Sequence, residues 1–464
     1  MNRIPDELLS RLLKKALSKG GDYADIFIEN TKPLTIQLED DKIEKLTSGL
    51  DSGIGIRVIF NGKSAYAYSN DFSEESLEGI AEAVSSAVRE NAESTDLIFD
   101  MTRVKPQLDF IIQQYPGDID IKKKIDLVER ANRTAKGISS SIKQVSVIYR
   151  DAVQKICVAT SNGTIAEDER IYTLGIVHAV AADGKTLQTG YEPAGGLAGF
   201  ELFDENLFEE LAVKAAKRAV SMLGARKAPG GRMPVVVSAE AGGTMIHEAI
   251  GHGLEADLAQ QGLSVYTGKI DQQIASPLIT IVDDSTLPNK RGSFRFDDEG
   301  VFSQKSILVE KGVLKGYMHS RLTAMKDGVE STGNGRRQSY KYRPIPRMTN
   351  TFIERGSDDP DEIVRSVEKG FFVKKMGGGQ VNTVTGEFVF EVSEGYIIEK
   401  GTVGDIVRGA TLIGDGPAIL QSIDMVGSDQ GFAIGTCGKD AQGAPVSDAM
   451  PTVRIPEMVV GGEV

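Results

Sequence analysis

The spacing of hydrophobic and polar residues predicts helices and strands in turn along the first half of the chain. Between residues 6 and 18 the apolar positions are three and four apart, which predicts an amphipathic helix. Alternating segments typical of strands follow at 24–29, 34–46, 55–60 and 64–68. The breaks between them include the stretch Thr31 to Pro33 and the hairpin-type pair Asn61 and Gly62. A second helix is expected at 74–91.

A similar order of elements recurs between residues 119 and 223. The pattern predicts helices at 119–136 and 205–223, with strands at 145–150, 155–160, 171–181 and 186–191 between them. We interpret this repeated order of helix, strands and helix as a duplicated layout. The segment 224–234 is rich in Gly and Pro, which is typical of a linker. We therefore expect an N-terminal domain of residues 1–225 and a C-terminal domain of residues 226–464.

The second half of the chain consists mainly of short segments with strand character, separated by glycines. They lie at 235–237, 279–282, 306–309, 371–374, 386–393, 396–399 and 406–413. Helical patterning is confined mainly to 361–369 and to the stretch that follows residue 243. The whole pattern predicts an α+β protein with two domains. The first mixes helices with an antiparallel sheet, and the second is β-rich and barrel-like around one central helix.

Composition and charge exclude several classes of protein. A chain of 464 residues exceeds the usual size of one hydrophobic core, which also favours two domains. It has neither a run of about 18 apolar residues nor an apolar signal segment, so we expect a cytoplasmic protein without a membrane span. The net charge of −13 and the lack of long basic runs argue against nucleic acid as a partner. Cys157 and Cys437 are too few for a disulfide framework.

Candidate chemistry is concentrated in the stretch from Met245 to Asp257. It contains His247, Glu248 and His252, and the chain has only four histidines. Zinc peptidases place a Glu directly after the first of two closely spaced histidines. The imidazoles bind the metal, and the carboxylate takes a proton from the water that the metal activates. The stretch therefore predicts a catalytic zinc site.

The spacing of the two histidines requires an irregular helix. On a regular α-helix, residues five apart point roughly 140° apart, so His247 and His252 could not reach one ion. A π-bulge would bring residues i and i+5 together. Alternatively, the helix ends near Gly251 and Gly253, and the backbone that follows turns His252 back. The sequence leaves both alternatives open.

A catalytic zinc usually has three protein ligands, so one more is needed. Cys437 is the better of the two cysteines because glycines flank it, although a lone Cys is more often a buried structural thiol. Glu255 could accept the second ring proton of a histidine ligand. Alternatively, Glu255 belongs with Asp257 to a solvated helix end. The acidic groups at 283–284 and 297–299 are interpreted as charged turns.

Several stretches of the second half resemble the TldD/PmbA peptidase family, whose signature is HExxxH. These stretches are 247–257, 332–337, 346–351, 377–381, 386–391, 408–413 and 435–439. The N-terminal half has the expected size but no comparably specific motif. The resemblance implies that His247, His252 and Cys437 bind the metal and that Glu248 is the base. It also implies an active, TldD-type subunit, since TldE/PmbA-type subunits lack the His-Glu-His set.

The resemblance further implies the cofactor, the substrate and the partner of the protein. It implies one zinc ion per active subunit, an enclosed site that admits unfolded or small peptides, and a dimer with a second copy or a TldE/PmbA-like paralogue. Arg336, Arg337, Arg347 and His319 could then contact the peptide, although exposed arginines that only solvate a loop are an equal alternative. A purely structural zinc is disfavoured, since such sites usually have four protein ligands. The rival hypothesis is a non-catalytic binding or assembly subunit, such as a modulator of DNA gyrase.

Overall fold

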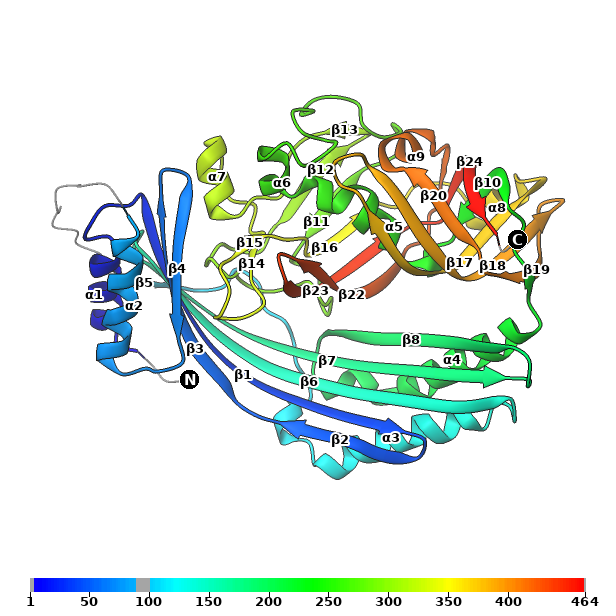
Figure 1. The fold of residues 1–464 in the computed structure, drawn as a ribbon, viewed down its shortest axis with the longest axis horizontal. Helices are drawn as coiled ribbons and strands as arrows, with labels where there is room; N and C mark the ends of the chain where they lie inside the picture. The colour runs from blue at the N-terminus through cyan, green and yellow to red at the C-terminus, as the bar shows by residue number, and fades with distance from the viewer. Residues whose placement is uncertain (1–3, 89–100, 463–464) are drawn as a thin grey trace.

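A twisted sheet of eight strands forms the N-terminal half of the protein (Figure 1). The computed structural model describes residues 4–88 and 101–462. The elements of the first part are α1 (Asp6–Ala16), β1 (Tyr23–Glu39), β2 (Lys42–Ser48), β3 (Asp51–Phe60), β4 (Lys63–Ser69) and α2 (Glu74–Ser86). Those of the second part are β5 (Thr102–Val104), η1 (Pro116–Asp118), α3 (Ile121–Lys136), β6 (Ile142–Thr160), β7 (Thr164–Ala182), β8 (Leu187–Leu197), η2 (Phe200–Asn206) and α4 (Leu207–Leu223). Positions 89–91 of the predicted second helix lie outside the described residues.

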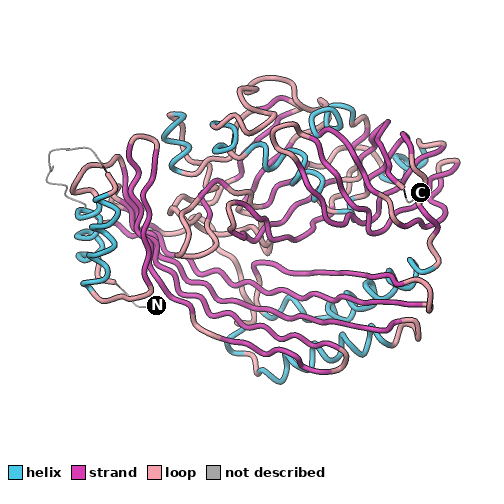
Figure 2. The backbone as a smooth tube through the Cα atoms, in the orientation of Figure 1, coloured by secondary structure: helices cyan, strands magenta, loops and turns pink. Residues whose placement is uncertain are grey.

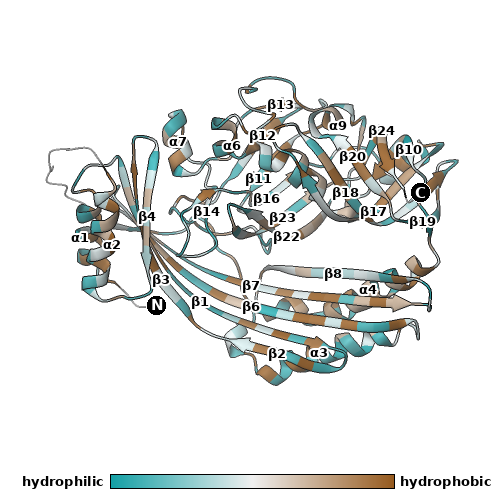
Figure 3. Cartoon of the chain, in the orientation of Figure 1, coloured by the Kyte–Doolittle hydropathy of each residue, from teal (hydrophilic) through white to brown (hydrophobic). Residues whose placement is uncertain are grey.

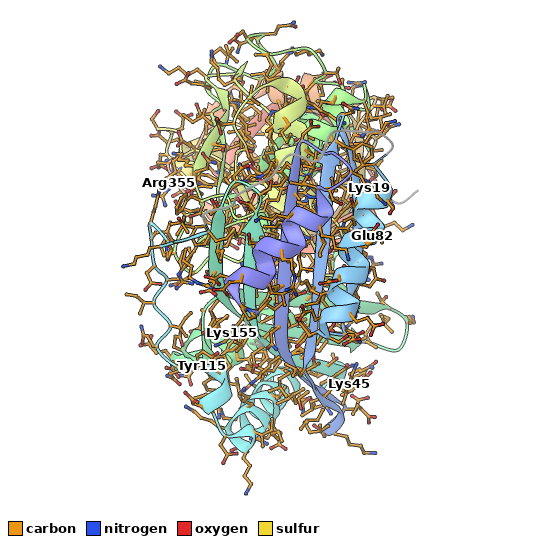
Figure 4. All side chains as sticks on the ribbon, turned by 90° about the vertical axis from the view of Figure 1, so that its left-hand side faces the viewer. Lys19, Lys45, Glu82, Tyr115, Lys155 and Arg355 are labelled. Atoms are coloured by element: carbon orange, nitrogen blue, oxygen red, sulfur yellow. The ribbon has the colours of Figure 1, made fainter. Side chains whose placement is uncertain are left out.

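Helices cover one face of this sheet. Ile26 and Ile28 of β1 pack in one cluster with α1 and α2, and Ile36 of the same strand packs with α3 and α4. Because alternate residues of a strand point to opposite faces, these side chains share a face. Figure 3 shows the alternation as brown and teal bands along β1, β6 and β7. At the outer surface of the α1 and α2 layer, Lys19 and Glu82 form an ion pair of 2.9 Å (Figure 4).

The opposite face of the sheet supports the C-terminal half, which lies above the long strands in Figure 1. Phe27 of β1 packs in one buried cluster with Tyr340 from a C-terminal loop. Beside it, Arg57 of β3 lies 2.8 Å from Glu299, and both side chains are buried. Residues 298 and 299 do lie in a charged turn, as interpreted, but the turn is buried because arginines of the sheet pair with its carboxylates. A second such pair joins Arg170 and Asp298 at 2.7 Å.

The predicted break at Thr31 to Pro33 is absent, and β1 runs through it as one strand. Pro33 pairs with Ala152 on β6, so the strand continues on that side. On its other side β1 changes partner, since β3 pairs as far as Thr31 and β2 begins at Leu34. The missing N–H of Pro33 thus coincides with a gap in the ladder, where no donor is needed.

A closed barrel is the first layer of the C-terminal half. Its ring runs β17, β10, β24, β20, β18 and back to β17. The strands of this sheet are β9 (Arg226–Lys227), β10 (Gly231–Val237), β17 (Lys369–Val381), β18 (Glu387–Glu399), β19 (Thr402–Arg408), β20 (Thr411–Asp415), β21 (Met425–Val426) and β24 (Val453–Gly461). The predicted α+β class with a β-rich, barrel-like C-terminal half is confirmed. The predicted boundary at residues 225 and 226 lies between α4 and β9.

A second sheet of six strands packs beside the barrel. It has the order β13, β12, β11, β16, β23 and β22. Its strands are β11 (Ile281–Asp284), β12 (Lys305–Glu310), β13 (Val313–Leu314), β16 (Asn350–Ile353), β22 (Gly431–Lys439) and β23 (Gln442–Met450). The interpretation of 283–284 as a charged turn is wrong, because both residues belong to β11 and are buried. Outside both sheets lie β14 (Gly335–Arg336), β15 (Ile345–Pro346), α7 (Arg321–Asp327), α8 (Pro360–Arg365) and α9 (Gly416–Ser422). Strands dominate both halves of the molecule (Figure 2), and no helix of the described ranges is long and apolar enough to cross a membrane.

The predicted central helix lies between these two sheets as a series of short turns. They are η3 (Ala239–Ala241), α5 (Thr244–Ile246), η4 (His247–Gly251), η5 (His252–Leu254) and α6 (Ala256–Gln260). Met245 and Ile250 belong to one buried cluster with Phe390 of the barrel and Val446 of the second sheet. Both layers thus fix the helical turns by apolar packing, while His247 and His252 remain available for a site.

Candidate metal centre

The helical backbone at the two histidines is irregular in both of the ways that their spacing allows. The N–H of His252 donates to the carbonyl of His247, five residues earlier, which makes one π turn. A tight 3-10 turn follows, and the chain is extended at Glu255. The wide turn leaves backbone groups without regular helical partners, and the hydroxyl of Tyr266 donates to one of them, the carbonyl of Ala249, at 3.1 Å. Residues five apart can therefore share a face here.

His247, His252 and Cys437 converge on one point. Their candidate donor atoms all lie within 4.8 Å of one another. The Sγ of Cys437 lies 3.5 Å from the Nε2 of His252, although the two residues are 185 positions apart. Cys437 comes from β22, the edge strand of the second sheet, which passes beside the helical turns. The structure thus brings together the ligand set that the family resemblance implies.

These donors fit a zinc ion in spacing and in chemistry. Ordinary Zn–S and Zn–N bonds at a tetrahedral angle place the sulfur and nitrogen about 3.6 Å apart. The observed separation of 3.5 Å matches this value. Burial raises the pKa of the Cys437 thiol, but hydrogen bonds with His247 and His252 outweigh this and lower the pKa to about 5. The thiolate, which is the form that binds metal, is therefore favoured at neutral pH.

Glu248 lies on the wall of the same cavity. The cavity has a volume of about 600 Å³, and His247, Glu248, His252 and Cys437 all line it. The Glu248 side chain is half-buried, and it forms no hydrogen bond or ion pair with any residue that the structure describes. Its carboxylate is therefore available to a ligand in the cavity.

A cluster of charged side chains contacts the Nδ1 side of the His252 ring. Its Nδ1 lies 2.9 Å from a carboxylate oxygen of Glu255, which is fully buried. The ammonium of Lys439 lies 3.1 Å from Glu255 and 2.6 Å from Asp257. Burial raises the pKa of the Glu255 carboxyl, but Lys439 and His252 lower it to about 2. Glu255 is therefore ionised, and it fixes the His252 ring so that Nε2 points toward Cys437.

Three residues that surround the metal ligands were not predicted from the sequence to support the site. Asp257 was interpreted as part of a solvated helix end, but its ion pair with Lys439 shows that this interpretation is wrong. Lys439 follows Cys437 by two positions in a motif that the sequence singled out, so the signal was present. Asp448 had no signal, because pairing of β22 with β23 brings it to the site. Its carboxylate lies 3.9 Å from Nδ1 of His247, and burial raises its pKa to about 6.

The three arginines and the histidine considered as substrate contacts lie outside the lining of this cavity. Arg336, Arg337 and Arg347 are 2%, 4% and 0% exposed, and His319 is buried too. The alternative that the arginines are exposed and solvate a loop is therefore wrong. Their guanidinium groups donate to backbone carbonyls inside the protein, and Arg347 donates to that of Cys437. Arg347 thus holds the part of β22 that carries the thiol.

Loss of the Glu255 carboxylate should weaken the metal site without removing a ligand. In Glu255→Gln the ring of His252 loses its charged partner, so we expect zinc affinity to fall by about 10- to 100-fold. Competition with a fluorescent zinc chelator measures this change. Asp257→Asn is the matched control, because it removes the other partner of Lys439 and leaves the contact between Glu255 and His252. Equal zinc affinity in the Glu255→Gln and unmodified proteins would contradict the assigned role.

Family models and curated relatives match almost the whole chain. The models are described as PmbA/TldA metallopeptidase domain 1, central domain and C-terminal domain, and they match residues 24–90, 114–223 and 230–462. A Haemophilus influenzae protein named metalloprotease TldD homolog is 38% identical over 451 residues, which cover 95% of this chain and 93% of the relative. A metalloprotease of Methanocaldococcus jannaschii is 36% identical, with coverage of 94% of this chain and 96% of the relative.

Solved structures share the fold at lower sequence identity. A Thermotoga maritima protein described as a modulator of a DNA gyrase has a TM-score of 0.81 and 23% identity, and the match covers 98% of this chain and 100% of that one. TldE from Thermococcus kodakarensis has a TM-score of 0.77 and 18% identity, with coverage of 98% and 99%. At these identities the similarity establishes the fold alone.

Proposed function

The chain belongs to the PmbA/TldA metallopeptidase family, and on that basis we propose that it is a zinc-dependent peptidase acting on unfolded or small peptides. The observation that carries the proposal is the convergence of His247, His252 and Cys437 on a cavity that Glu248 also lines. A zinc ion held by the three donors would polarise the scissile carbonyl and lower the pKa of a water molecule. One ion per subunit is sufficient for this chemistry.

Glu248 would carry the proton in this reaction. Its carboxylate faces the cavity without a partner from the described residues, so it can accept a proton from the attacking water. The same group can then donate that proton to the amine that leaves. His247 and His252 flank Glu248 in the chain, so the π turn that aligns the histidines also positions the base.

The strands around the cavity favour an extended substrate. Ile434 to Lys439 of β22 and Gly379 to Val381 of β17 both line it. β22 is an edge strand that pairs with β23, so its second edge offers unpaired backbone groups beside Cys437. A peptide in extended conformation could add to this edge through main-chain hydrogen bonds. Most backbone groups of a folded protein are already paired, whereas those of an unfolded or small peptide are free to pair with this edge. This is why we propose unfolded or small peptides as substrates.

Metal removal tests the proposal directly. Dialysis against a chelator should abolish hydrolysis of an internally quenched, unstructured peptide, and one equivalent of zinc per subunit should restore it. Peptide cleavage and metal content by mass spectrometry are measured on the same samples. Full hydrolysis by metal-free protein would contradict the proposal. Zinc-loaded protein that cleaves no peptide would favour a non-catalytic subunit instead.

We also infer that the working unit is a dimer. The occurrence of a TldE structure among proteins with this fold supports a paralogue as partner, and a second copy is the alternative. The presence of the His247, Glu248, His252 and Cys437 set supports assignment of this chain as the active subunit.

A further inference from the structure

A second cavity adjoins the one at the metal centre. It has a volume of about 690 Å³, and it shares Thr244 and Ile434 with the first cavity as lining residues. Its walls come from β8 and α4 of the N-terminal half and from β17, β18 and β22 of the C-terminal half. The two cavities are therefore neighbours, and the second lies between the two halves of the protein.

Two sequence motifs without a role in the metal centre meet in this second cavity. They are the glycine run that begins at Gly377 and the segment that begins at Arg408, and both line its wall. In the ladder between β17 and β18, neither Gly377 nor Gly378 has a partner residue. Such a bulge leaves backbone N–H groups outside the regular ladder. A Cβ atom built on Gly378 would meet nothing within 4 Å, whereas one built on Gly377 would meet Ser393 and Glu391, so space for a ligand lies beside the backbone of Gly378.

Arg408 is the free positive charge of this cavity. The other two cations on its wall already have carboxylate partners, since Arg218 and Lys375 both pair with Glu192. The guanidinium of Arg408 forms no hydrogen bond or ion pair with any described residue. Glu391 also lines the wall without such a partner, and its charge opposes the binding of an anion. The half-buried Arg408 and the open glycine backbone nevertheless form the usual receptor for a carboxylate.

We propose that the second cavity binds a carboxylate of the substrate peptide through Arg408 and the backbone amide of Gly378. The assignment of that ligand as a substrate rests on the proposed function. The carboxylate belongs either to the C-terminus of a short peptide or to an acidic side chain near the scissile bond. Because the two cavities adjoin, a peptide held in both has a set direction, and its cleavage site lies at a set distance from the carboxylate.

Peptide binding without turnover tests this inference. The probe is a dansylated, alanine-rich hexapeptide, prepared as the free acid and as the C-terminal amide, and fluorescence anisotropy is measured on the full-length, zinc-loaded Glu248→Gln protein. We expect the acid to bind about tenfold more tightly than the amide, since hydrogen bonds to charged groups are the strong ones. A second pair of amidated peptides, with one Glu or one Gln, shows whether an acidic side chain can supply the carboxylate.

Further substitutions in the same protein assign the effect to the cavity. Arg408→Gln should abolish the preference for a carboxylate, Arg408→Lys should keep part of it, and Glu391→Gln should increase it severalfold. The matched control is Arg232→Gln, because Arg232 is an exposed barrel residue that pairs with Glu457 and does not line the cavity. The inference is overturned if neither peptide pair shows a preference for the carboxylate, if none of the peptides binds, or if the preference survives Arg408→Gln. Peptide cleavage by the unmodified protein, measured separately, shows whether the proposed function also fails.

Discussion

The Glu248→Gln protein is expected to keep its zinc and to lose nearly all peptide hydrolysis. General-base catalysis contributes about 10²- to 10⁴-fold, so we expect kcat/KM to fall by roughly 10³-fold. The amide of Gln has nearly the shape of the carboxylate but cannot accept the proton of the attacking water. Because Glu248 lies outside the His247, His252 and Cys437 donor set, the metal content should not change. Steady-state kinetics and metal analysis on one preparation measure both quantities.

Glu240→Gln is the matched control for this substitution. Glu240 is exposed, lies eight residues before Glu248 in the chain and does not line the metal cavity. The control should therefore retain both its zinc and its rate. Hydrolysis at the unmodified rate by a zinc-loaded Glu248→Gln protein would exclude this residue as the proton carrier. Loss of zinc from that protein would instead indicate that Glu248 contributes to metal binding.

The sequence determined more of the metal site than of its surroundings. The five-residue spacing of His247 and His252 already required a π-bulge or a helix end, because side-chain directions on a helix follow from its geometry alone. The choice between the two was not local, since it depends on packing and on partners such as Tyr266, and the structure contains both. The sequence therefore predicts that the helix is irregular at the histidines. The form of the irregularity depends on contacts with the rest of the chain.

Residues that arrive through strand pairing were harder to predict. Cys437 was one candidate among lone thiols until the family resemblance singled it out, because no local pattern relates it to a helix 185 positions earlier. Asp448 was not predicted for the same reason, because the register of β22 against β23 determines its position. Lys439 carried a signal in its motif, but its charge alone favoured a solvated position. Its burial depends on Glu255 and Asp257, which pair with it.

The same limit applies to the strands and to the buried arginines. Pro33 is a local strand breaker, and only the change of partner from β3 to β2 explains why β1 continues through it. Arg336 and Arg347 were expected either to lie at the surface or to contact a ligand, because a guanidinium group is costly to bury. Each instead donates to two backbone carbonyls of distant residues, and these contacts offset that cost. Such contacts depend on the complete fold and leave no pattern in the neighbouring residues.

Removal of the Cys437 thiolate is expected to abolish both zinc binding and hydrolysis. Cys437→Ala leaves only two imidazoles, and we expect zinc affinity to fall by more than about 100-fold, the upper end of what a lost outer-shell partner costs. At one equivalent of zinc, the protein should then be largely metal-free and inactive. Both measurements distinguish this substitution from Glu248→Gln, since one removes the metal and the other leaves it in place.

Cys157→Ala is the matched control, because Cys157 is the other cysteine of the chain and is buried in the helix-covered face of the N-terminal sheet. It should bind one zinc per chain and retain its hydrolytic rate, which shows that loss of a buried thiol is not itself the cause. Metal analysis after dialysis and circular dichroism on both proteins separate loss of zinc from loss of fold. If folded Cys437→Ala protein retained one tightly bound zinc ion, the third ligand would have to be another residue. Asp448, which lies 3.9 Å from His247 on the same wall, would then be the first to test.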